Sequence, residues 1–233
     1  MMISIVIPAL NEEKCLPKLM ECIKAQTYRD YEIIVADANS TDRTRNIAKA
    51  CKCKIAKGGM PAVGRNNGAR MAKGDLILFL DADVQFSKDF LRDAVDEFKR
   101  KKLGIAGFRL LPLGNNIVDK LFFYVFNLWT RSTQFFYPNA AGAGILCKKN
   151  LHQSVKGFDQ SIKLSEDIDY AKRCGKKGKF RILKSPRLYV AMRRFENEGR
   201  LKTGSKLFLS ALHRIFFGEI KSDVFKYNLK DRK

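Results

Sequence analysis

The apolar positions in the first hundred residues fall into short runs separated by helical patterns. Four runs predict buried strands: ISIVIP, YEIIVAD, CKIAKG and DLILFLDAD, which begin at residues 3, 31, 53 and 75. Between these runs apolar residues recur at helical spacing, as Leu16, Leu19 and Ile23 do. Strands that alternate with helices predict βαβ units, and therefore an α/β fold with a mostly parallel central sheet flanked by helices.

Local signals predict where several helices begin. Asn11 suits the N-cap of the first helix, whereas Pro17 favours a start close to itself, because proline fits the first turn. Ser87 is expected to cap the helix that carries Phe90 and Phe98 on one face. In the second half, LGIAGFRLLPL predicts a strand, LSEDIDYAKRCGKKG a helix, RILKSPRLYVAM one or two short strands, and residues 193–220 a long helical stretch.

A densely aromatic segment runs from residue 117 to residue 138. One interpretation places Phe122, Phe123 and Trp129 in the core, because aromatic side chains dominate core burial. The other is a helix that lies in a membrane interface, since Lys120 and Arg131 interrupt the run and argue against a span. Near the C-terminus, KLFLSALHRIFFGEIK poses the same choice between packing and an anionic membrane surface.

Length and charge narrow the class of protein. The chain has 233 residues, enough for one large α/β domain, and a formal net charge of +21. Residues 172–233 carry 19 Lys and Arg against 5 Asp and Glu. This excess predicts a negatively charged partner: phosphates, nucleic acid or an anionic membrane surface. The six cysteines form no C-x-x-C pair, which favours free thiols over a metal or redox pair at Cys51 and Cys53.

The N-terminal sequence MMISIVIPALNEEK lacks the basic segment of a signal peptide. No window reaches the roughly 18 uninterrupted apolar residues of a membrane span. We therefore expect a cytoplasmic protein that is peripheral at the cytosolic face of the membrane.

Polar residues follow three of the predicted strands. They are Pro8 to Asn11, Asp37, and Asp81 to Asp83. Because ligands of parallel sheets bind at the carboxyl ends of the strands, these residues are expected to meet in one crevice. The pair Asp81 and Asp83 has two interpretations: a capped turn, or oxygen ligands for Mg²⁺ or Mn²⁺ that also binds substrate phosphates.

Four motifs occur in a characteristic order: SIVIPALNEE, YEIIVADANSTDRT, GRNNGARMAKGDLILFLDADV and KGFDQSIKLSEDIDYAKRC. Together they resemble family 2 glycosyltransferases over about residues 2–195. The resemblance implies the GT-A fold, a Rossmann-like sheet in a single catalytic domain with a helical C-terminal extension. Residues 1–110 would form the nucleotide-sugar half and 111–195 the acceptor half, followed by a basic amphipathic helical region at 196–233.

The resemblance also implies roles for individual residues. The nucleotide-sugar site would contain Pro8, Ala9, Asn11, Glu12, Asp37, Arg65, Asn66 and Asp81. Asp83 would hold the metal, and the acidic pair Glu166 and Asp167 would supply the catalytic base, for which we choose Asp167. Where the family often has D-D-G or D-G-G, this chain has Asp37-Ala38-Asn39, which leaves base and sugar specificity open.

The resulting hypothesis is a metal-dependent inverting glycosyltransferase that uses a UDP- or GDP-sugar. Its acceptor would present a hydroxyl or phosphate, on a polyprenyl phosphate, a glycolipid or a soluble glycan. Arg193 and Arg194 would reach a phosphate of the donor or of a lipid-linked acceptor, unless they form a solvated basic face. Two alternatives remain: a basic nucleic-acid-binding protein, supported only by charge, and a sugar nucleotidyltransferase, for which PALNEE lacks the glycine-rich triphosphate loop.

Overall fold

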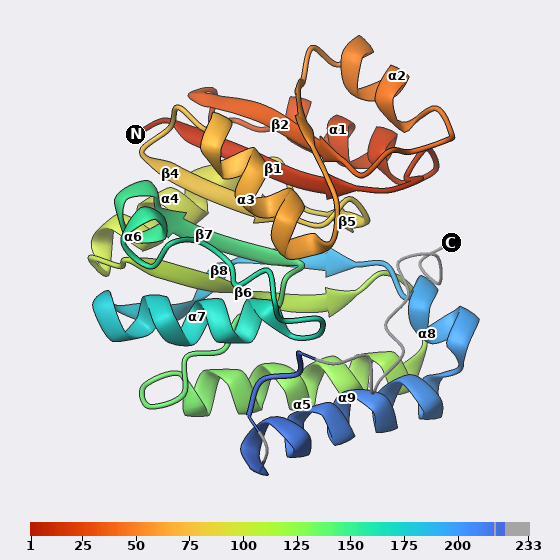
Figure 1. Ribbon diagram of the computed structural model, residues 1–233, viewed down its shortest axis with the longest axis vertical. Coiled ribbons are helices and arrows are strands. Elements are labelled where there is room, and N and C mark those ends of the chain that lie inside the picture. Colours follow the sequence, from red (N-terminus) through yellow and green to blue (C-terminus); the bar gives the residue numbers. More distant parts are fainter. Residues whose placement is uncertain (217, 222–233) are drawn as a thin grey trace.

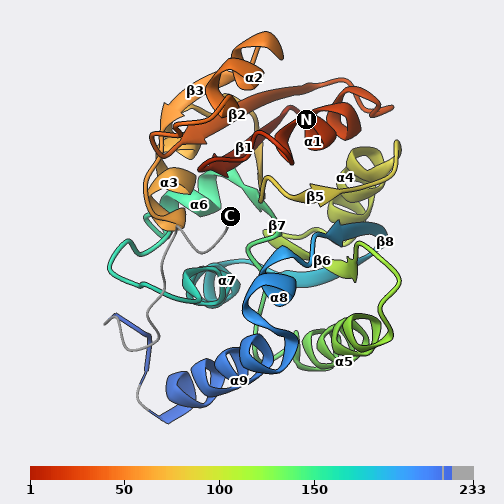
Figure 2. The same cartoon turned by 90° about the vertical axis from the view of Figure 1, so that its right-hand side faces the viewer.

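The computed structural model describes residues 1–216 and 218–221 (Figure 1). Within these residues, eight strands form one sheet in the order β3-β2-β1-β4-β7-β6-β8-β5. Figure 2 shows helices α3, α6 and α7 on one side of this sheet and α1 and α4 on the other. The arrangement is the α/β fold predicted from the sequence.

The first half of the chain follows the prediction closely. The four parallel strands are β1 (Ile3–Ala9), β2 (Tyr31–Asp37), β3 (Lys54–Lys57) and β4 (Leu76–Leu80). The helices between and after them are α1 (Leu16–Lys24), α2 (Thr44–Ala50), α3 (Pro61–Met71) and α4 (Phe90–Arg100). The alternation of strand and helix patterns in the sequence therefore predicted the fold of this half correctly.

Two expected helix caps are wrong. Helix α1 begins beside Pro17, as that residue indicated, and its N-cap is Cys15 rather than Asn11. Asn11 instead adopts a left-handed backbone conformation with φ 54° and lies in the loop before the helix. Helix α4 follows Asp89, so Ser87 lies too early in the chain to act as its N-cap.

The second half of the sheet is mixed rather than parallel. Its strands are β5 (Val84–Gln85), β6 (Ile105–Pro112), β7 (Gly144–Lys148) and β8 (Phe180–Val190). Strand β7 lies antiparallel between β4 and β6, and β5 is antiparallel to β8, whereas β6 and β8 are parallel. Among the described strands, four of the seven pairings are thus parallel. The segment predicted as one or two strands is the single long strand β8.

The buried core occupies both faces of the sheet. In β4, Leu76, Leu78 and Leu80 pack into the cluster that includes α1 and α4, whereas Ile77 and Phe79 pack into the cluster on the opposite face. Successive side chains of a strand point to opposite faces, so a strand covered on both sides has no polar alternation. The uninterrupted apolar run before Asp81 is the consequence.

The remaining helices lie in the second half of the chain. They are α5 (Ile117–Thr133), α6 (Lys149–Ser154), α7 (Glu166–Lys177), α8 (Arg193–Glu198) and α9 (Arg200–Phe216). The predicted long C-terminal helix is interrupted at Gly199, whose φ of 88° is incompatible with a continuous helix. The expected boundary between residues 195 and 196 falls inside α8, and residues 222–233 lie outside the described part.

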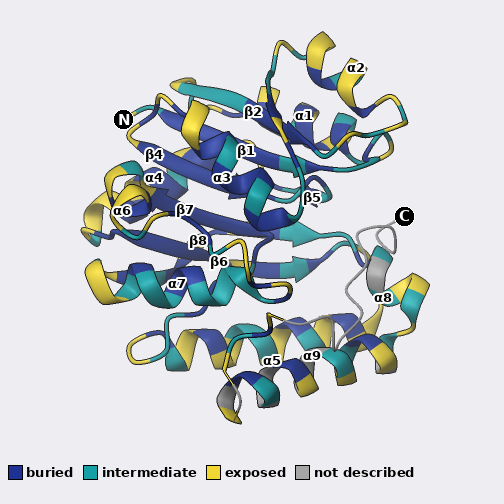
Figure 3. Cartoon of the chain, viewed as in Figure 1, coloured by how far each residue is buried: buried dark blue, intermediate teal, exposed yellow. Residues whose placement is uncertain are grey.

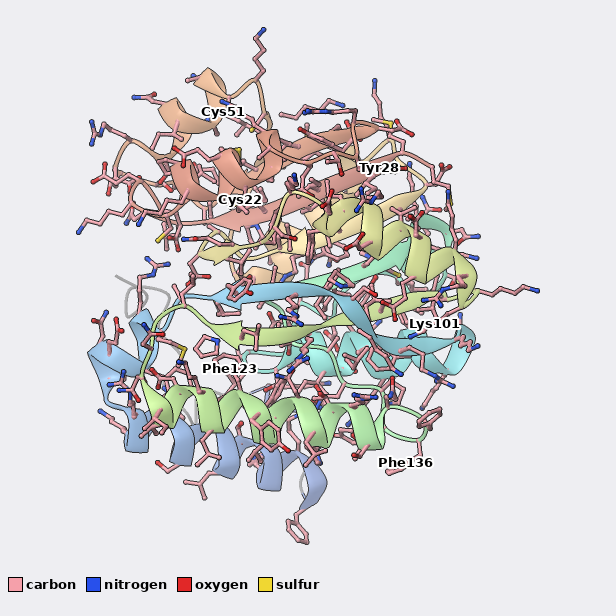
Figure 4. All side chains as sticks on the ribbon, turned by 180° about the vertical axis from the view of Figure 1, so that it is seen from behind. Cys22, Tyr28, Cys51, Lys101, Phe123 and Phe136 are labelled. Atoms are coloured by element: carbon pink, nitrogen blue, oxygen red, sulfur yellow. The ribbon has the colours of Figure 1, made fainter. Side chains whose placement is uncertain are left out.

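The core interpretation of the aromatic segment holds for only one side of α5, where Phe122 and Phe126 are partly buried against the core. Phe123 is buried and points toward the sheet, but Ile117 is 79% exposed and Tyr124 is 64% exposed (Figure 4). Figure 3 shows exposed positions along the outer side of this helix. Phe136, on the turn after the helix, is 79% exposed and points away from the body. The helix therefore presents an apolar face to solvent.

Candidate active site at the carboxyl edge of the sheet

The carboxyl ends of β1 and β2 are joined by a polar network. Ala9 and Asp37 are register partners at the last positions of the two strands. In the loop after β1, the backbone N–H of Asn11 donates to Ser40 Oγ at 2.9 Å, and Asn11 Oδ1 accepts from the N–H of Thr41 at 2.9 Å. These bonds explain the left-handed conformation of Asn11 and hold the loops after β1 and β2 together, as their place at one sheet edge predicted.

A buried arginine connects the end of β4 to the start of α7. Arg65, from α3, is only 2% exposed. Its Nη1 donates to Glu166 Oε1 at 2.6 Å, and its Nη2 donates to Asp81 Oδ1 at 3.0 Å and to the carbonyl of Gly142 at 3.2 Å. Burial of a guanidinium is tolerated because both neighbouring carboxylates compensate its charge. Three predicted site residues are thereby brought into one cluster.

Asp167 contacts the backbone N–H of the same residue, Gly142. Its Oδ2 accepts the N–H of Gly142 at 2.5 Å, and its Oδ1 accepts the N–H of Ile168 at 2.9 Å. Desolvation and the neighbouring charge of Glu166 raise the pKa of Asp167 to about 6, and Arg65 only partly offsets them. A carboxylate poised near neutral pH can accept a proton from a reacting hydroxyl.

Gly142 is a site residue that the sequence did not identify. A Cβ at this position would lie 2.5 Å from Nη2 of Arg65 and 3.2 Å from Oδ2 of Asp167, so a side chain would separate the arginine from its carbonyl acceptor. The available signal was the run of small residues AAGAG before β7, which permits close approach of a backbone. That run alone does not say what approaches it.

A second cluster forms around Arg193 at the start of α8. Its Nη2 donates to Glu12 Oε2 at 2.8 Å and to Asp83 Oδ2 at 3.2 Å. Glu12 is nearly buried in the loop after β1, and Asp83 follows β4. Because Asp81 and Asp83 are two residues apart, the two clusters are adjacent. Arg193 therefore belongs to this edge of the sheet, whereas the side chain of Arg194 lies outside the described part.

Two expected nucleotide-site residues make contacts away from these clusters. Asp37, nearly buried, accepts the N–H of Ser40 at 3.3 Å and forms an ion pair with Arg45 at 3.6 Å. The side-chain amide of Asn66 makes two hydrogen bonds to the backbone of Phe158. Asn66 Nδ2 donates to the carbonyl of Phe158, and Asn66 Oδ1 accepts from the N–H of Phe158, both at 2.8 Å. Asn66 thus anchors the loop that precedes α7.

The acidic residues suit a divalent ion that also binds phosphate. Among the described residues, no group of three His, Cys, Asp or Glu could hold a metal alone. Asp83 nevertheless presents carboxylate oxygen to a cationic group, Arg193, and Mg²⁺ or Mn²⁺ is commonly held by one or two carboxylates plus substrate phosphates. His152 is unsuited, because it is buried against the Tyr170 hydroxyl at 2.9 Å and desolvation lowers its pKa to about 4.

Comparison with known proteins identifies relatives with this sequence pattern. Residues 4–141 match the family model described as Glycosyl transferase family 2. A 4,4'-diaponeurosporenoate glycosyltransferase of Staphylococcus haemolyticus is 36% identical over 102 residues, which cover 40% of this chain and 27% of that protein. A dolichyl N-acetyl-alpha-D-glucosaminyl phosphate 3-beta-D-2,3-diacetamido-2,3-dideoxy-beta-D-glucuronosyltransferase of Methanococcus voltae is 24% identical over 211 residues, which cover 80% of this chain and 65% of that protein. The chain thus spans less than two thirds of either relative.

Solved structures share the fold. Residues 1–349 of Staphylococcus aureus TarS, crystallised with UDP-GlcNAc, superpose with a TM-score of 0.69 at 18% identity, covering 100% of this chain and 78% of that one. The mannosyltransferase PcManGT of Pyrobaculum calidifontis, in complex with GDP-Man and Mn²⁺, gives a TM-score of 0.67 at 19% identity, covering 89% and 64%. At these identities the likeness establishes the GT-A architecture.

Proposed function

Because this chain belongs to glycosyl transferase family 2, we propose that it transfers a sugar from a UDP- or GDP-linked donor to a hydroxyl or phosphate of an acceptor, with inversion at the anomeric carbon. One observation carries the proposal: Asp167, with a pKa of about 6, accepts the N–H of Gly142, whose carbonyl accepts from Arg65 of the Arg65–Asp81 pair at the end of β4. A proton acceptor and a carboxylate expected in the nucleotide-sugar site are thus connected through Arg65 and Gly142.

Asp167 is the better candidate for the base within the Glu166–Asp167 pair. Glu166 is engaged by the guanidinium of Arg65 at 2.6 Å, which directs its carboxylate into the protein. Within residues 1–216 and 218–221, Asp167 accepts hydrogen bonds only from backbone N–H groups, and it is partly exposed. A base that removes the acceptor's proton during one attack opposite the leaving group produces inversion, and no covalent nucleophile is required.

The donor would occupy the loops after β1, β2 and β4. Pro8, Ala9, Asn11 and Glu12 form one wall and Asp37 the next, with Asp81 toward the sugar. Support comes from the joined loops and from structural neighbours crystallised with UDP-GlcNAc or GDP-Man. Arg65 is too deeply buried to lie against an open donor site, so we assign it the positioning of Asp81 and Glu166.

We assign the divalent ion, Mg²⁺ or Mn²⁺, to Asp83. A neighbour with the same fold was crystallised with Mn²⁺ and GDP-Man. When bound, the ion supplies positive charge that stabilises the leaving diphosphate. Arg193 already lies against Asp83 and Glu12, so the same edge of the sheet can offer a second positive charge to the phosphates.

Titration with UDP and GDP, with and without Mn²⁺, tests the donor and metal assignments. We expect one nucleotide to bind in a metal-dependent manner, and Asp83→Ala to weaken that binding by about tenfold or more, equivalent to ~1.4 kcal/mol, because the metal loses its protein ligand. Asp96→Ala, which removes an exposed carboxylate on α4, is the matched control. Absence of binding of either nucleotide by folded wild-type protein would contradict the proposed function.

Arg193 competes with a metal for Asp83, which yields a second expectation. Without nucleotide, Arg193→Gln should bind Mn²⁺ about tenfold more tightly than wild type, because the competing cation is gone. Free Mn²⁺ is measured by electron paramagnetic resonance, with Lys202→Gln as a control for loss of an exposed positive charge. Since Arg194 is the next residue, the Arg193→Gln/Arg194→Gln variant is measured as well. Equal Mn²⁺ affinity in all four proteins rules out the competition.

We further propose a lipid-linked acceptor, on a polyprenyl phosphate or glycolipid, and a peripheral position at the cytosolic face of the membrane. The name of the Methanococcus voltae relative specifies a dolichyl N-acetyl-alpha-D-glucosaminyl phosphate as its substrate, and the exposed apolar side of α5 is suited to lipid. No helix in the described ranges is long and apolar enough to cross a bilayer. Nothing in the described residues favours nucleic-acid binding or nucleotidyl transfer over glycosyl transfer.

A further inference from the structure

Helix α5 carries an apolar stripe on its solvent side. Its exposed members recur at helical spacing: Ile117, Val118, Leu121, Tyr124, Val125, Leu128 and Trp129. Phe135 and Phe136, which follow the end of the helix, are also exposed, and Figure 4 shows Phe136 at that end. The stripe contains no acidic residue, because Asp119, the acid of this helix, is buried and paired with Arg200 at 2.9 Å. Contiguous exposed apolar surface of this kind marks a site of interaction.

A basic pocket adjoins the stripe. A cavity of about 390 Å³ between α5, β6 and β8 shares Tyr124 and Leu128 with the stripe. Its charged lining consists of Arg109, Lys120, Arg131 and Lys184, without an acid. In the described part of the chain none of these four cations forms an ion pair, so their charge is available to an anion from outside.

The pocket is built on a rigid frame. Asn127, on the inner side of α5, binds the backbone of Leu110 in both directions, donating to its carbonyl at 2.7 Å and accepting its N–H at 3.0 Å. On β8, the backbone N–H of Lys184 donates to the buried carboxylate of Glu97 at 3.0 Å. These bonds fix the helix and the strand that carry the cations, so the pocket exists before a ligand arrives.

We propose that the α5 stripe and the basic pocket together dock the protein on an anionic bilayer, with the stripe among the acyl chains and a phospholipid phosphate in the pocket. An apolar helix face flanked by cations is how interfacial helices bind membranes. Each Lys or Arg near an anionic surface contributes about 1 kcal/mol, and four converge here. The inference deepens the proposed membrane location, and its test needs neither donor nor acceptor.

A second copy of the chain is a poorer occupant than a bilayer. In a two-fold symmetric dimer through α5, the same patch on both subunits would face itself. Each copy would then bring four unpaired cations to one interface, and each chain carries a net charge of +21. Like charges opposed across an interface are destabilising, whereas the anionic bilayer has the complementary sign.

Vesicle flotation with the full chain tests the proposal. Vesicles of phosphatidylcholine alone are compared with vesicles that also contain phosphatidylglycerol. The pocket variant is Lys120→Gln/Arg131→Gln, and the stripe variant is Leu121→Gln/Leu128→Gln. The matched control, Lys99→Gln/Arg100→Gln, removes two exposed cations from α4. Its net charge is therefore the same as that of the pocket variant. All substituted side chains are exposed, and circular dichroism verifies folding.

We expect the wild type and the control to float with anionic vesicles. The pocket variant should partition onto them about 10- to 30-fold more weakly, because each of the two cations it lacks contributes ~1 kcal/mol of binding free energy. The stripe variant should bind both vesicle types poorly. Equal partitioning of the pocket variant and the control, or equal binding to neutral and anionic vesicles, overturns the pocket assignment. A wild-type dimer in light scattering that the stripe variant abolishes, without vesicle binding, would assign the face to a second copy.

Discussion

Replacing Asp167 with asparagine is expected to lower kcat by about 10²- to 10⁴-fold, the range associated with loss of a general base. The amide is nearly isosteric and can still accept the N–H of Gly142, so the fold and nucleotide affinity should persist. Steady-state kinetics with nucleotide titration measures both effects. Asp169→Asn is the matched control, because it also removes a carboxylate from α7. The Asp169 carboxylate pairs with Arg173 at 2.7 Å and lies outside the two site clusters.

The pH profile gives the same residue an independent readout. The pKa of Asp167 is raised to about 6, so the carboxylate becomes protonated, and thereby inactive as a base, as the pH falls through that value. We expect kcat/KM to decline below pH 6 and to approach a plateau above pH 7, because kcat/KM reports the free enzyme. In Asp167→Asn this acidic limb should vanish. A variant that retains the limb, or retains wild-type kcat, would exclude Asp167 as the base.

Replacing Arg65 with methionine is expected to destabilise the protein by about 3–5 kcal/mol, because it removes a buried charge and leaves two partly buried carboxylates without their counter-ion. Glu166 and Asp81 would then repel each other, and the carbonyl of Gly142 would lose its donor. Urea unfolding at pH 7 measures the loss, and activity should fall because Asp81 is no longer held beside Gly142, whose N–H positions Asp167.

Arg43→Met provides the comparison for Arg65. Arg43 pairs with Glu13 at 3.3 Å while its side chain is 80% exposed, and such surface pairs contribute between 0 and about 1 kcal/mol. If Arg65→Met loses no more stability than Arg43→Met, the buried contacts of Arg65 with Asp81, Glu166 and Gly142 do not stabilise the fold as proposed. Both variants remove one arginine charge, so a difference between their free energies of unfolding reports the effect of burying the ion pair.

The N-terminal half of the fold was predictable because its information is local. Apolar runs and helical spacing located β1 to β4 and the helices between them, and the residues after each strand were correctly expected at one edge of the sheet. Asp81 and Asp83 illustrate this, since parallel strands flanked by helices place their carboxyl ends together. The caps at Asn11 and Ser87 were wrong: the helices follow Cys15 and Asp89, neither of which makes a side-chain capping bond, and Asn11 instead bonds to the loop after β2.

The sequence by itself therefore determined the alternation of strands and helices, the edge at which polar residues gather and, through its motifs, the family. Tertiary structure alone decided which of those residues touch. Arg65 and Glu166 are 101 positions apart, and Arg193 and Asp83 are 110 apart, so no local pattern links them. The same holds for α5: helical periodicity shows that a helix has an apolar face, but only packing against the sheet determines that this face points outward, beside four cations drawn from β6, α5 and β8.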